Sequence, residues 1–197
     1  GALKHTLVSA TNGTKTLYVW AKDLAGNISV SSTKTINYDT IPPVIALTAP
    51  VNNFTINDSN KSAVSFSGTC TENGVINISG DIAGNFSCTA GSFSGILNFT
   101  SAADGDLSVT LNQTDLAGNS ATPVTVNLKK DTGIPSLAIT APAASSFINN
   151  ANQSSFNLTG TCSEDGRQVQ VSGAINASAI CNAGVFSTNL NMASVAE

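Results

Sequence analysis

The chain has 197 residues, of which 41% are hydrophobic, 10% are charged and 6% are aromatic. Its formal net charge is −4 and Arg167 is its one arginine, so it lacks the basic surface that binding to nucleic acid requires. The longest apolar runs have about five residues, far fewer than the roughly 20 of a membrane-spanning helix. A length near 200 residues predicts one or two domains, and the abundance of Ser, Thr, Asn and Gly favours short strands joined by turns.

The same short sequences recur along the chain at a constant spacing. Three landmarks lie 92 residues apart: Asp-Leu-Ala-Gly-Asn at 23–27 and 115–119, Asp-Thr at 39–40 and 131–132, and Gly-Thr-Cys at 68–70 and 160–162. Cys88 and Cys181 are 93 residues apart because the second copy has one more residue in the turn before them. This spacing predicts a tandem array of units of about 92 residues.

The repeat divides the chain into three parts. Residues 39–130 form one complete unit, residues 1–38 match the last part of a unit, and residues 131–197 match the first two thirds of another. Half a sandwich exposes strand edges and a core face, so we expect the sequence to continue beyond both ends in a longer chain. The alternative is that partial units of neighbouring copies complete each other, although residues 1–12 and 186–197 would then duplicate one strand.

The first partial unit contains the most prominent aromatic residues. By alignment with Val109 and Leu111 of the complete unit, its apolar strand residues face inward, which leaves Tyr18 and Trp20 facing outward. Two exposed aromatic side chains form a small platform for contact with a glycan or a protein. The alternative is that both residues pack under a neighbouring loop or fill a different core.

In the complete unit, apolar and polar residues alternate with the period of a β-strand, as in Val64-Ser65-Phe66-Ser67, and turn residues separate the alternating segments. Seven strands are predicted, near residues 44–48, 63–70, 75–79, 85–90, 92–99, 106–114 and 122–129. Seven short antiparallel strands in about 90 residues are typical of an immunoglobulin-like β-sandwich. The predicted fold class is therefore all-β, with tandem sandwiches of about seven strands each.

Each unit carries two cysteines. The sequence provides one histidine, His5, and no closely spaced cysteine pairs, so Cys70 with Cys88 and Cys162 with Cys181 are interpreted as disulfides rather than metal ligands. Free thiols are the alternative. Disulfides imply an oxidising compartment, so we expect export to the cell surface, the medium or the periplasm. The loop of about 18 residues is interpreted as too short for the sheet-to-sheet bridge of antibody domains.

The turn sequence Asp-Leu-Ala-Gly-Asn before a last strand that ends in Asp-Thr-x-x-Pro resembles the bacterial immunoglobulin-like repeats of large secreted or surface-anchored proteins. The resemblance covers the whole chain. It implies a role as a stalk or adhesive segment of a long surface fibre, with neighbouring repeats as partners and no catalytic residues. It does not account for the cysteine pair.

Aspartates at the turns and linkers have two interpretations. Structurally, Asp23 with Asn27 and Asp115 with Asn119 each bracket the glycine of a tight turn. Asp39 and Asp131 begin the linkers. Functionally, their oxygens could hold Ca²⁺ at the junctions and stiffen a rod, as in some related adhesins, although each motif supplies one carboxylate and Ca²⁺ needs six or more oxygens. We favour the turn interpretation and predict no other cofactor.

The predicted function is a rigid structural segment that presents a distal binding element. A lone His5 in a partial unit gives no base for a nucleophile, so we expect no enzyme activity. Proline in both linkers restricts bending between successive sandwiches. The alternatives are a binding module that contacts a glycan or protein receptor directly, through Tyr18 and Trp20, and a spacer domain of a secreted enzyme or a phage-like tail fibre.

Overall fold

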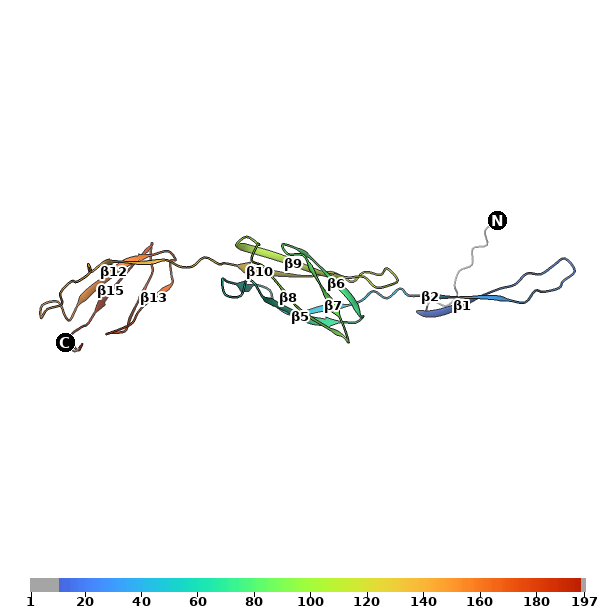
Figure 1. Cartoon of the computed structure of the whole chain (residues 1–197), viewed down its shortest axis with the longest axis horizontal. Helices are drawn as coiled ribbons and strands as arrows, with labels where there is room; N and C mark the ends of the chain where they lie inside the picture. The colour runs from blue at the N-terminus through green and yellow to red at the C-terminus, as the bar shows by residue number, and fades with distance from the viewer. Residues whose placement is uncertain (1–10, 196–197) are drawn as a thin grey trace. The chain divides into compact units, whose positions relative to one another are not determined.

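The protein is described by a computed structural model over residues 11–195, which contains fifteen β-strands and no helix in that range (Figure 1). Among these residues there is accordingly no helix that is long and apolar enough to cross a membrane. The chain divides into two compact units, one ending at Thr132 and the other beginning at Gly133. The predicted all-β class is confirmed.

The first unit begins with a two-stranded hairpin. Strand β1 (Gly13–Val19) pairs antiparallel with β2 (Ser32–Tyr38), in the register that places Gly13 opposite Tyr38 and Val19 opposite Ser32. No further strand covers either face of this hairpin in the described part of the unit, so the apolar side chains of both faces are exposed.

The rest of the first unit consists of two sheets packed on one core. A three-stranded sheet has the order β3-β5-β8, and a five-stranded sheet has the order β4-β10-β9-β6-β7. The strands are β3 (Ile45–Ala49), β4 (Phe54–Ile56), β5 (Val64–Cys70), β6 (Gly74–Gly80), β7 (Gly84–Cys88), β8 (Ser92–Leu97), β9 (Gly105–Gln113) and β10 (Val124–Lys130). We call residues 44–132 the sandwich.

The core of the sandwich follows from the alternation in its strands. In β5 and β9 every second side chain is buried, and these side chains meet between the sheets in one cluster that includes Phe66, Phe99 and Leu111. The rings of Phe66 and Phe86 join the two sheets at a centroid distance of 5.9 Å. A period of two therefore predicted both the strands and their inward faces.

The sandwich contains eight strands, so the prediction of seven was one strand short. The additional strand is β4, three residues long, which runs parallel to β10 and pairs Leu128 with Phe54 and Lys130 with Ile56. Three residues are too few to show an alternation, and β4 depends on a partner that follows about 70 residues later in the sequence.

The second unit contains two smaller sheets. One has the order β11-β12-β15 and the other pairs β13 with β14. Their bounds are β11 (Leu137–Ala141), β12 (Phe156–Cys162), β13 (Gln168–Val171), β14 (Ala177–Ile180) and β15 (Val185–Leu190). Six buried residues, Leu158 and Phe186 among them, form its core cluster.

Strand positions in the two units correspond at the spacing of the sequence repeat. β11 and β12 begin 92 residues after β3 and β5, and β15 begins 93 residues after β8. β1 and β2 begin 92 residues before β9 and β10, and the residue pairs of each hairpin are offset by the same number. The described residues of the second unit include no counterparts of β9 and β10.

Candidate functional site

The candidate functional site of this chain is the pair of linkers, each of which is held by hydrogen bonds at both of its ends. The first linker follows β2. Thr40 donates hydrogen bonds from its backbone N and its Oγ1 to Oδ1 of Asn12, at 3.3 and 3.1 Å. Asn12 in turn donates from Nδ2 to Oδ1 of Asp39 at 2.7 Å, and that same oxygen accepts from the backbone N of Ile41 at 3.0 Å. Residues 39–41 are thereby tied to the hairpin that precedes them.

The far end of the first linker is tied to the sandwich. The backbone N of Val44 donates to Oγ1 of Thr71 at 2.9 Å, and the backbone N of Thr71 donates to the carbonyl oxygen of Val44 at 3.0 Å. Pro43, next to this pair of bonds, is almost fully buried. Only Pro42 and Pro43 lie between the two sets of bonds, and the φ of both prolines is fixed.

The second linker begins with a stronger version of the same arrangement. Thr132 donates from its backbone N to Oδ2 of Asp104 at 2.9 Å, and its Oγ1 also contacts this carboxylate, at 2.9 and 3.0 Å. The buried ammonium group of Lys130 donates to Oδ1 of Asp104 at 2.9 Å and to the carbonyl oxygen of Ala102 at 2.7 Å. The Lys130 and Thr132 hydrogen bonds lower the pKa of Asp104 to about 2, because they stabilise the ionised carboxylate.

Within the second unit, the end of this linker repeats the contact made by Thr71. The backbone N of Ser136 donates to Oγ of Ser163 at 2.8 Å, and the backbone N of Ser163 donates to the carbonyl oxygen of Ser136 at 3.1 Å. Ser163 lies 92 residues after Thr71, and Asp104 lies 92 residues after Asn12. We call the Asn12–Thr40 and Asp104–Thr132 contacts the linker clamps.

The Asp-Leu-Ala-Gly-Asn turn has both a local role and a contact with the first linker. Asp115 accepts at Oδ1 from the backbone N of Ala117 and Asn119, at 2.9 and 2.8 Å, and at Oδ2 from Nδ2 of Asn119 at 2.8 Å. Gly118 has a φ of 93°, which favours glycine. Nδ2 of Asn119 also contacts the carbonyl oxygen of Asp39 at 3.3 Å. The turn therefore meets the linker that leads into its own sandwich.

The hairpin repeats this turn. Asp23 accepts from the backbone N and from Nδ2 of Asn27, both at 2.8 Å. Hydrogen bonds from Asn27 lower the pKa of Asp23, as those from Asn119 lower the pKa of Asp115. These carboxylates are engaged by the turn itself, which supports the structural interpretation of the motif.

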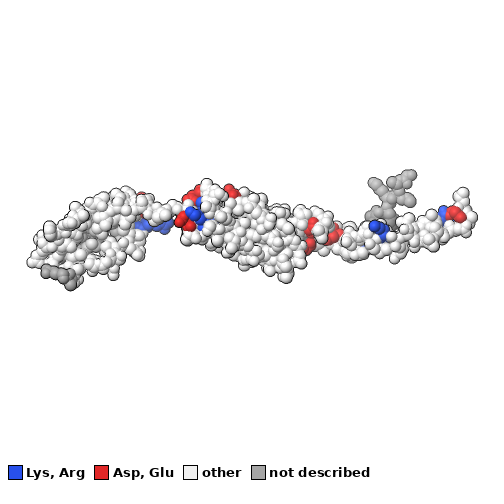
Figure 2. All heavy atoms as spheres, viewed as in Figure 1, with Lys and Arg blue, Asp and Glu red and all other residues white. Residues whose placement is uncertain are grey.

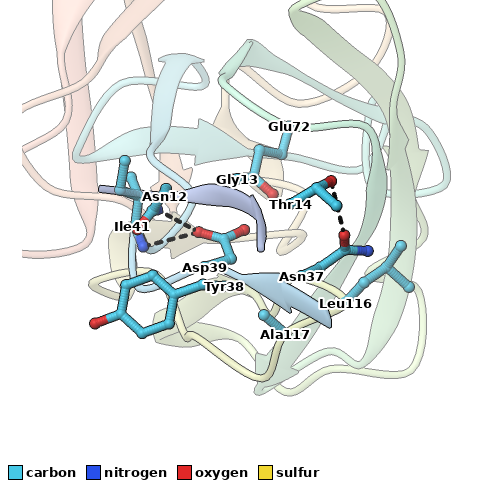
Figure 3. Close-up of a pocket in the computed structure, with 10 residues that line it drawn as sticks. All are labelled: Asn12, Gly13, Thr14, Asn37, Tyr38, Asp39, Ile41, Glu72, Leu116 and Ala117. Atoms are coloured by element: carbon cyan, nitrogen blue, oxygen red, sulfur yellow. Dashed lines mark hydrogen bonds between the residues drawn. The ribbon is translucent and has the colours of Figure 1, made fainter. Parts of the chain in front are cut away.

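An open groove of about 640 Å³ lies where the first linker meets the sandwich (Figure 3). It is lined by the start of β1 and the end of β2, by Asp39, by Glu72 and by Leu116 of the Asp-Leu-Ala-Gly-Asn turn. Among residues 11–195 no three His, Cys, Asp or Glu side chains are grouped so that they could hold a metal ion. Asp23, Asp39, Asp115 and Asp131 are thus not gathered into a common ligand set, and the backbone N of Asp131 donates to the carbonyl oxygen of Ile56 at 2.9 Å.

Charged side chains are concentrated at the ends of the sandwich, where the linkers are attached (Figure 2). The long faces between these ends are almost uncharged in this view.

Tyr18 and Trp20 are exposed, at 61% and 60% of their surface. Leu17 and Val19, on the other face of β1, are also exposed, at 43% and 67%. Exposure therefore does not separate the two aromatic side chains from the residues predicted to face inward. The aromatic platform stays a prediction.

Both predicted cysteine pairs are disulfides in the structure, with Cα–Cα distances of 6.1 Å for Cys70–Cys88 and 6.0 Å for Cys162–Cys181. The expectation that the span is too short to join two sheets was wrong for Cys70–Cys88. Cys70 ends β5 of the three-stranded sheet and Cys88 ends β7 of the five-stranded sheet. The chain passes from one sheet to the other in the short turn before β6, so 18 residues are enough.

Sequence reasoning did not identify the clamp residues Asn12 and Asp104 or the hydroxyl partners Thr71 and Ser163. The signal was present, because both clamp residues precede a glycine at the repeat spacing and both hydroxyl residues follow a cysteine at that spacing. The predictions that concern His5 and the remainder of residues 1–10 lie outside the described residues, as does Glu197.

No family model matches the chain, and no curated protein does. The solved structures that are similar to it include parts of two large adhesins. A tetra-tandem repeat from the extending region of a large adhesion protein has 20% identity and a TM-score of 0.42, over 93% of this chain and 50% of that one. A 1.5-MDa bacterial ice-binding adhesin, described for its host cell surface retention, has 14% identity and a TM-score of 0.40, over 92% of this chain and 64% of that one. The chain thus spans between half and two thirds of the length of these structures.

Proposed function

We propose that this chain is a structural stalk segment of an exported, adhesin-like surface protein, in which immunoglobulin-like repeats of about 92 residues are joined by linkers of restricted flexibility. The observation that carries the proposal is the linker geometry. Each linker is bonded at its start to the segment before it, through Thr40 or Thr132, and at its end to the segment after it, through Val44 or Ser136.

Restricted linkers suit a stalk because a chain of sandwiches holds its far end at a distance from a surface only if its joints resist bending. Two or three residues between hydrogen-bonded ends, with proline among them, leave few backbone torsions free. The disulfide in each unit and the resemblance of the turn and linker sequences to bacterial surface repeats support an extracellular or surface location. The proposal assigns no catalytic step and needs no cofactor.

The test measures how tightly the second linker controls the distance between the segments that it joins. Spin labels at Ser65→Cys in the sandwich and Ser178→Cys in the second unit, both exposed, report a distance distribution in the full chain. The variant Asp104→Ala removes the acceptor of Thr132, so we expect a distinctly broader distribution.

Asp106→Ala is the matched control. Asp106 also binds a lysine, Lys129 at 2.7 Å, but it lies within β9 and makes no hydrogen bond to the linker among those found in the structure. Its distribution is expected to match that of the parent chain. A parent distribution as broad as that of Asp104→Ala would contradict the proposal.

A further inference from the structure

The parallel strand pair β4–β10 stands apart from all the other strand pairs in the described structure, which are antiparallel. β4 follows the point where the chain enters the sandwich, and β10 immediately precedes the point where the chain leaves it. The second strand of the sandwich and its last strand are therefore bonded directly to each other.

Several hydrogen bonds extend this pairing beyond the three paired residues. Before β4, the backbone N of Asn53 donates to the carbonyl oxygen of Asn127 at 2.8 Å, and Oδ1 of Asn52 accepts from the backbone N of Asn127 at 2.9 Å. After β10, the backbone N of Asp131 donates to the carbonyl oxygen of Ile56 at 2.9 Å. The two segments are thus bonded from residue 52 to residue 56 without interruption by another strand.

The direction of the strands determines how a pulling force acts on these bonds. Tension along the chain first loads β3, which is paired with β5, and then pulls β4 from its N-terminal side, while it pulls β10 from its C-terminal side. Because the strands are parallel, these two pulls are opposed along a common axis. The hydrogen bonds lie across that axis, so they are loaded in shear and have to break together rather than one after another.

The side chains at the exit of β10 attach this strand firmly to the rest of the sandwich. Lys130 is 6% exposed and its ammonium group bonds to Asp104 and to the carbonyl oxygen of Ala102. Two neighbouring residues, Leu128 and Ile56, are almost fully buried. Tension arriving through Thr132 therefore acts on β10, which passes it both to its parallel partner β4 and to its antiparallel neighbour β9, where Lys130 is paired with Gly105.

We propose that the β4–β10 pair, with its flanking bonds from Asn52 and Asn53 to Asn127 and from Asp131 to Ile56, is the force-bearing element of the sandwich. The pair makes resistance to tension depend on direction. This inference rests on the proposed stalk function, in which each repeat carries tension between a surface and a bound target.

The first test compares two pulling directions on the same folded protein by single-molecule force spectroscopy. In one, the full chain is held at its N- and C-termini. In the other it is held at the C-terminus and at Ala103→Cys, an exposed residue just before β9. Gly105 of β9 is paired with Lys130 of β10, so the second geometry opens the β9–β10 ladder one pair at a time from its end.

We expect the sandwich to unfold at a force at least about twice as high in the end-to-end geometry as in the Ala103 geometry, since ladder bonds loaded in shear share the force. Folding stability is the same in both measurements, so the comparison isolates direction. Equal forces in the two geometries would overturn the proposal.

A matched pair of variants tests the bonds themselves. Asn52→Ala removes the acceptor for Asn127, between the entering and leaving segments. Asn73→Ala also removes a side-chain acceptor of a backbone N–H, that of Ala90 at 3.0 Å, but this bond involves neither β4 nor β10.

We expect Asn52→Ala to lower the end-to-end unfolding force and to leave the Ala103 force unchanged, whereas Asn73→Ala leaves the ratio of the two forces as it is. An equal loss of end-to-end force in both variants would refute a special role of β4–β10. The spin-label distances of the linkers do not depend on β4–β10, so failure here is distinguishable from failure of the stalk proposal.

Discussion

The five strands in the described part of the second unit have counterparts in the sandwich, but side chains at corresponding positions are buried very differently. Ile56 is 0% exposed, whereas Ile148, at the corresponding position 92 residues later, is 41% exposed. Ile45 is 6% exposed and its counterpart Leu137 is 56% exposed. The difference is not in the residues themselves, which are large and apolar at both positions.

What differs is the presence of the strands that cover these positions. In the sandwich, β9 and β10 contribute Leu107, Val109, Leu111, Val126 and Leu128 to the core. The described part of the second unit has no such strands, and residues 146–148, which correspond to β4, form no strand there. Burial and the existence of β4 are therefore properties of the assembled sheet, not of the local sequence.

The largest expected effect is the difference in stability loss between alanine substitutions at two corresponding positions. Ile56→Ala removes a fully buried side chain and should destabilise the sandwich by about 4 kcal/mol, because lost burial and a residual cavity add together. Ile148→Ala acts on a side chain that is already 41% exposed and should cost about 1 kcal/mol or less in the second unit.

Hydrogen exchange of the full chain in denaturant, followed separately for residues of each unit, measures both values in one protein. Equal losses at the two positions would show that Ile148 is buried in solution and that the two units do not differ as described.

The same comparison explains what sequence alone could and could not predict. β5 and β9 have long, regular alternations, such as Leu107-Ser108-Val109-Thr110-Leu111, and their positions were predicted to within about two residues. Paired cysteines that recur with the unit gave the disulfides. These features are local or follow from the repeat.

Features that depend on distant partners were missed. β4 exists because β10 is beside it, and Asn12 and Asp104 become clamps because Thr40 and Thr132 return to them after 28 residues. Likewise, the disulfide joins two sheets because β6 and β7 belong to a different sheet from β5. Alternation along one segment carries no information about which other segment it will meet.

Removing the disulfides sharpens the comparison between the units. The bridged cysteines are 18 residues apart in the sandwich and 19 in the second unit, so each bridge should contribute a similar amount, about 3 kcal/mol, by restricting the unfolded chain. The paired substitutions Cys70→Ser with Cys88→Ser should lower the unfolding free energy of the sandwich and leave its transition cooperative.

The corresponding Cys162→Ser with Cys181→Ser should abolish cooperative unfolding of the second unit, since its core cluster has six buried residues against eighteen in the sandwich. Chemical denaturation with unit-resolved exchange gives both results. Retention of a cooperative transition in the second unit without its disulfide would mean that its core is larger than the described cluster.

The smallest expected effect concerns the two linker clamps, which differ in one side-chain group: a carboxylate in one clamp and an amide in the other. Thr132 is held by the carboxylate of Asp104, whereas Thr40 is held by the amide of Asn12. The pKa of Asp104 is about 2 in the folded protein, below the value of about 3.9 for an aspartate in an unfolded chain. A lowered pKa means that the stabilisation is fully present above about pH 4 and is lost as the pH falls through about 2.

Amide chemical shifts of the full chain, recorded from pH 5 to pH 1.5, should therefore show Thr132 changing with a midpoint near 2 while Thr40 keeps its hydrogen bonds to Asn12. Two variants, in which each clamp receives the side chain of the other, test whether the carboxylate causes the change. Asp104→Asn should make the Thr132 shift independent of acid, and Asn12→Asp should introduce an acid transition at Thr40. If the Thr132 shift still changes with acid in Asp104→Asn, another group controls it and the clamp is not the carboxylate of Asp104.

The two clamps occupy equivalent positions, so an amide is sufficient to hold a linker. The carboxylate at the second linker is explained by the buried Lys130, which only an anion can neutralise.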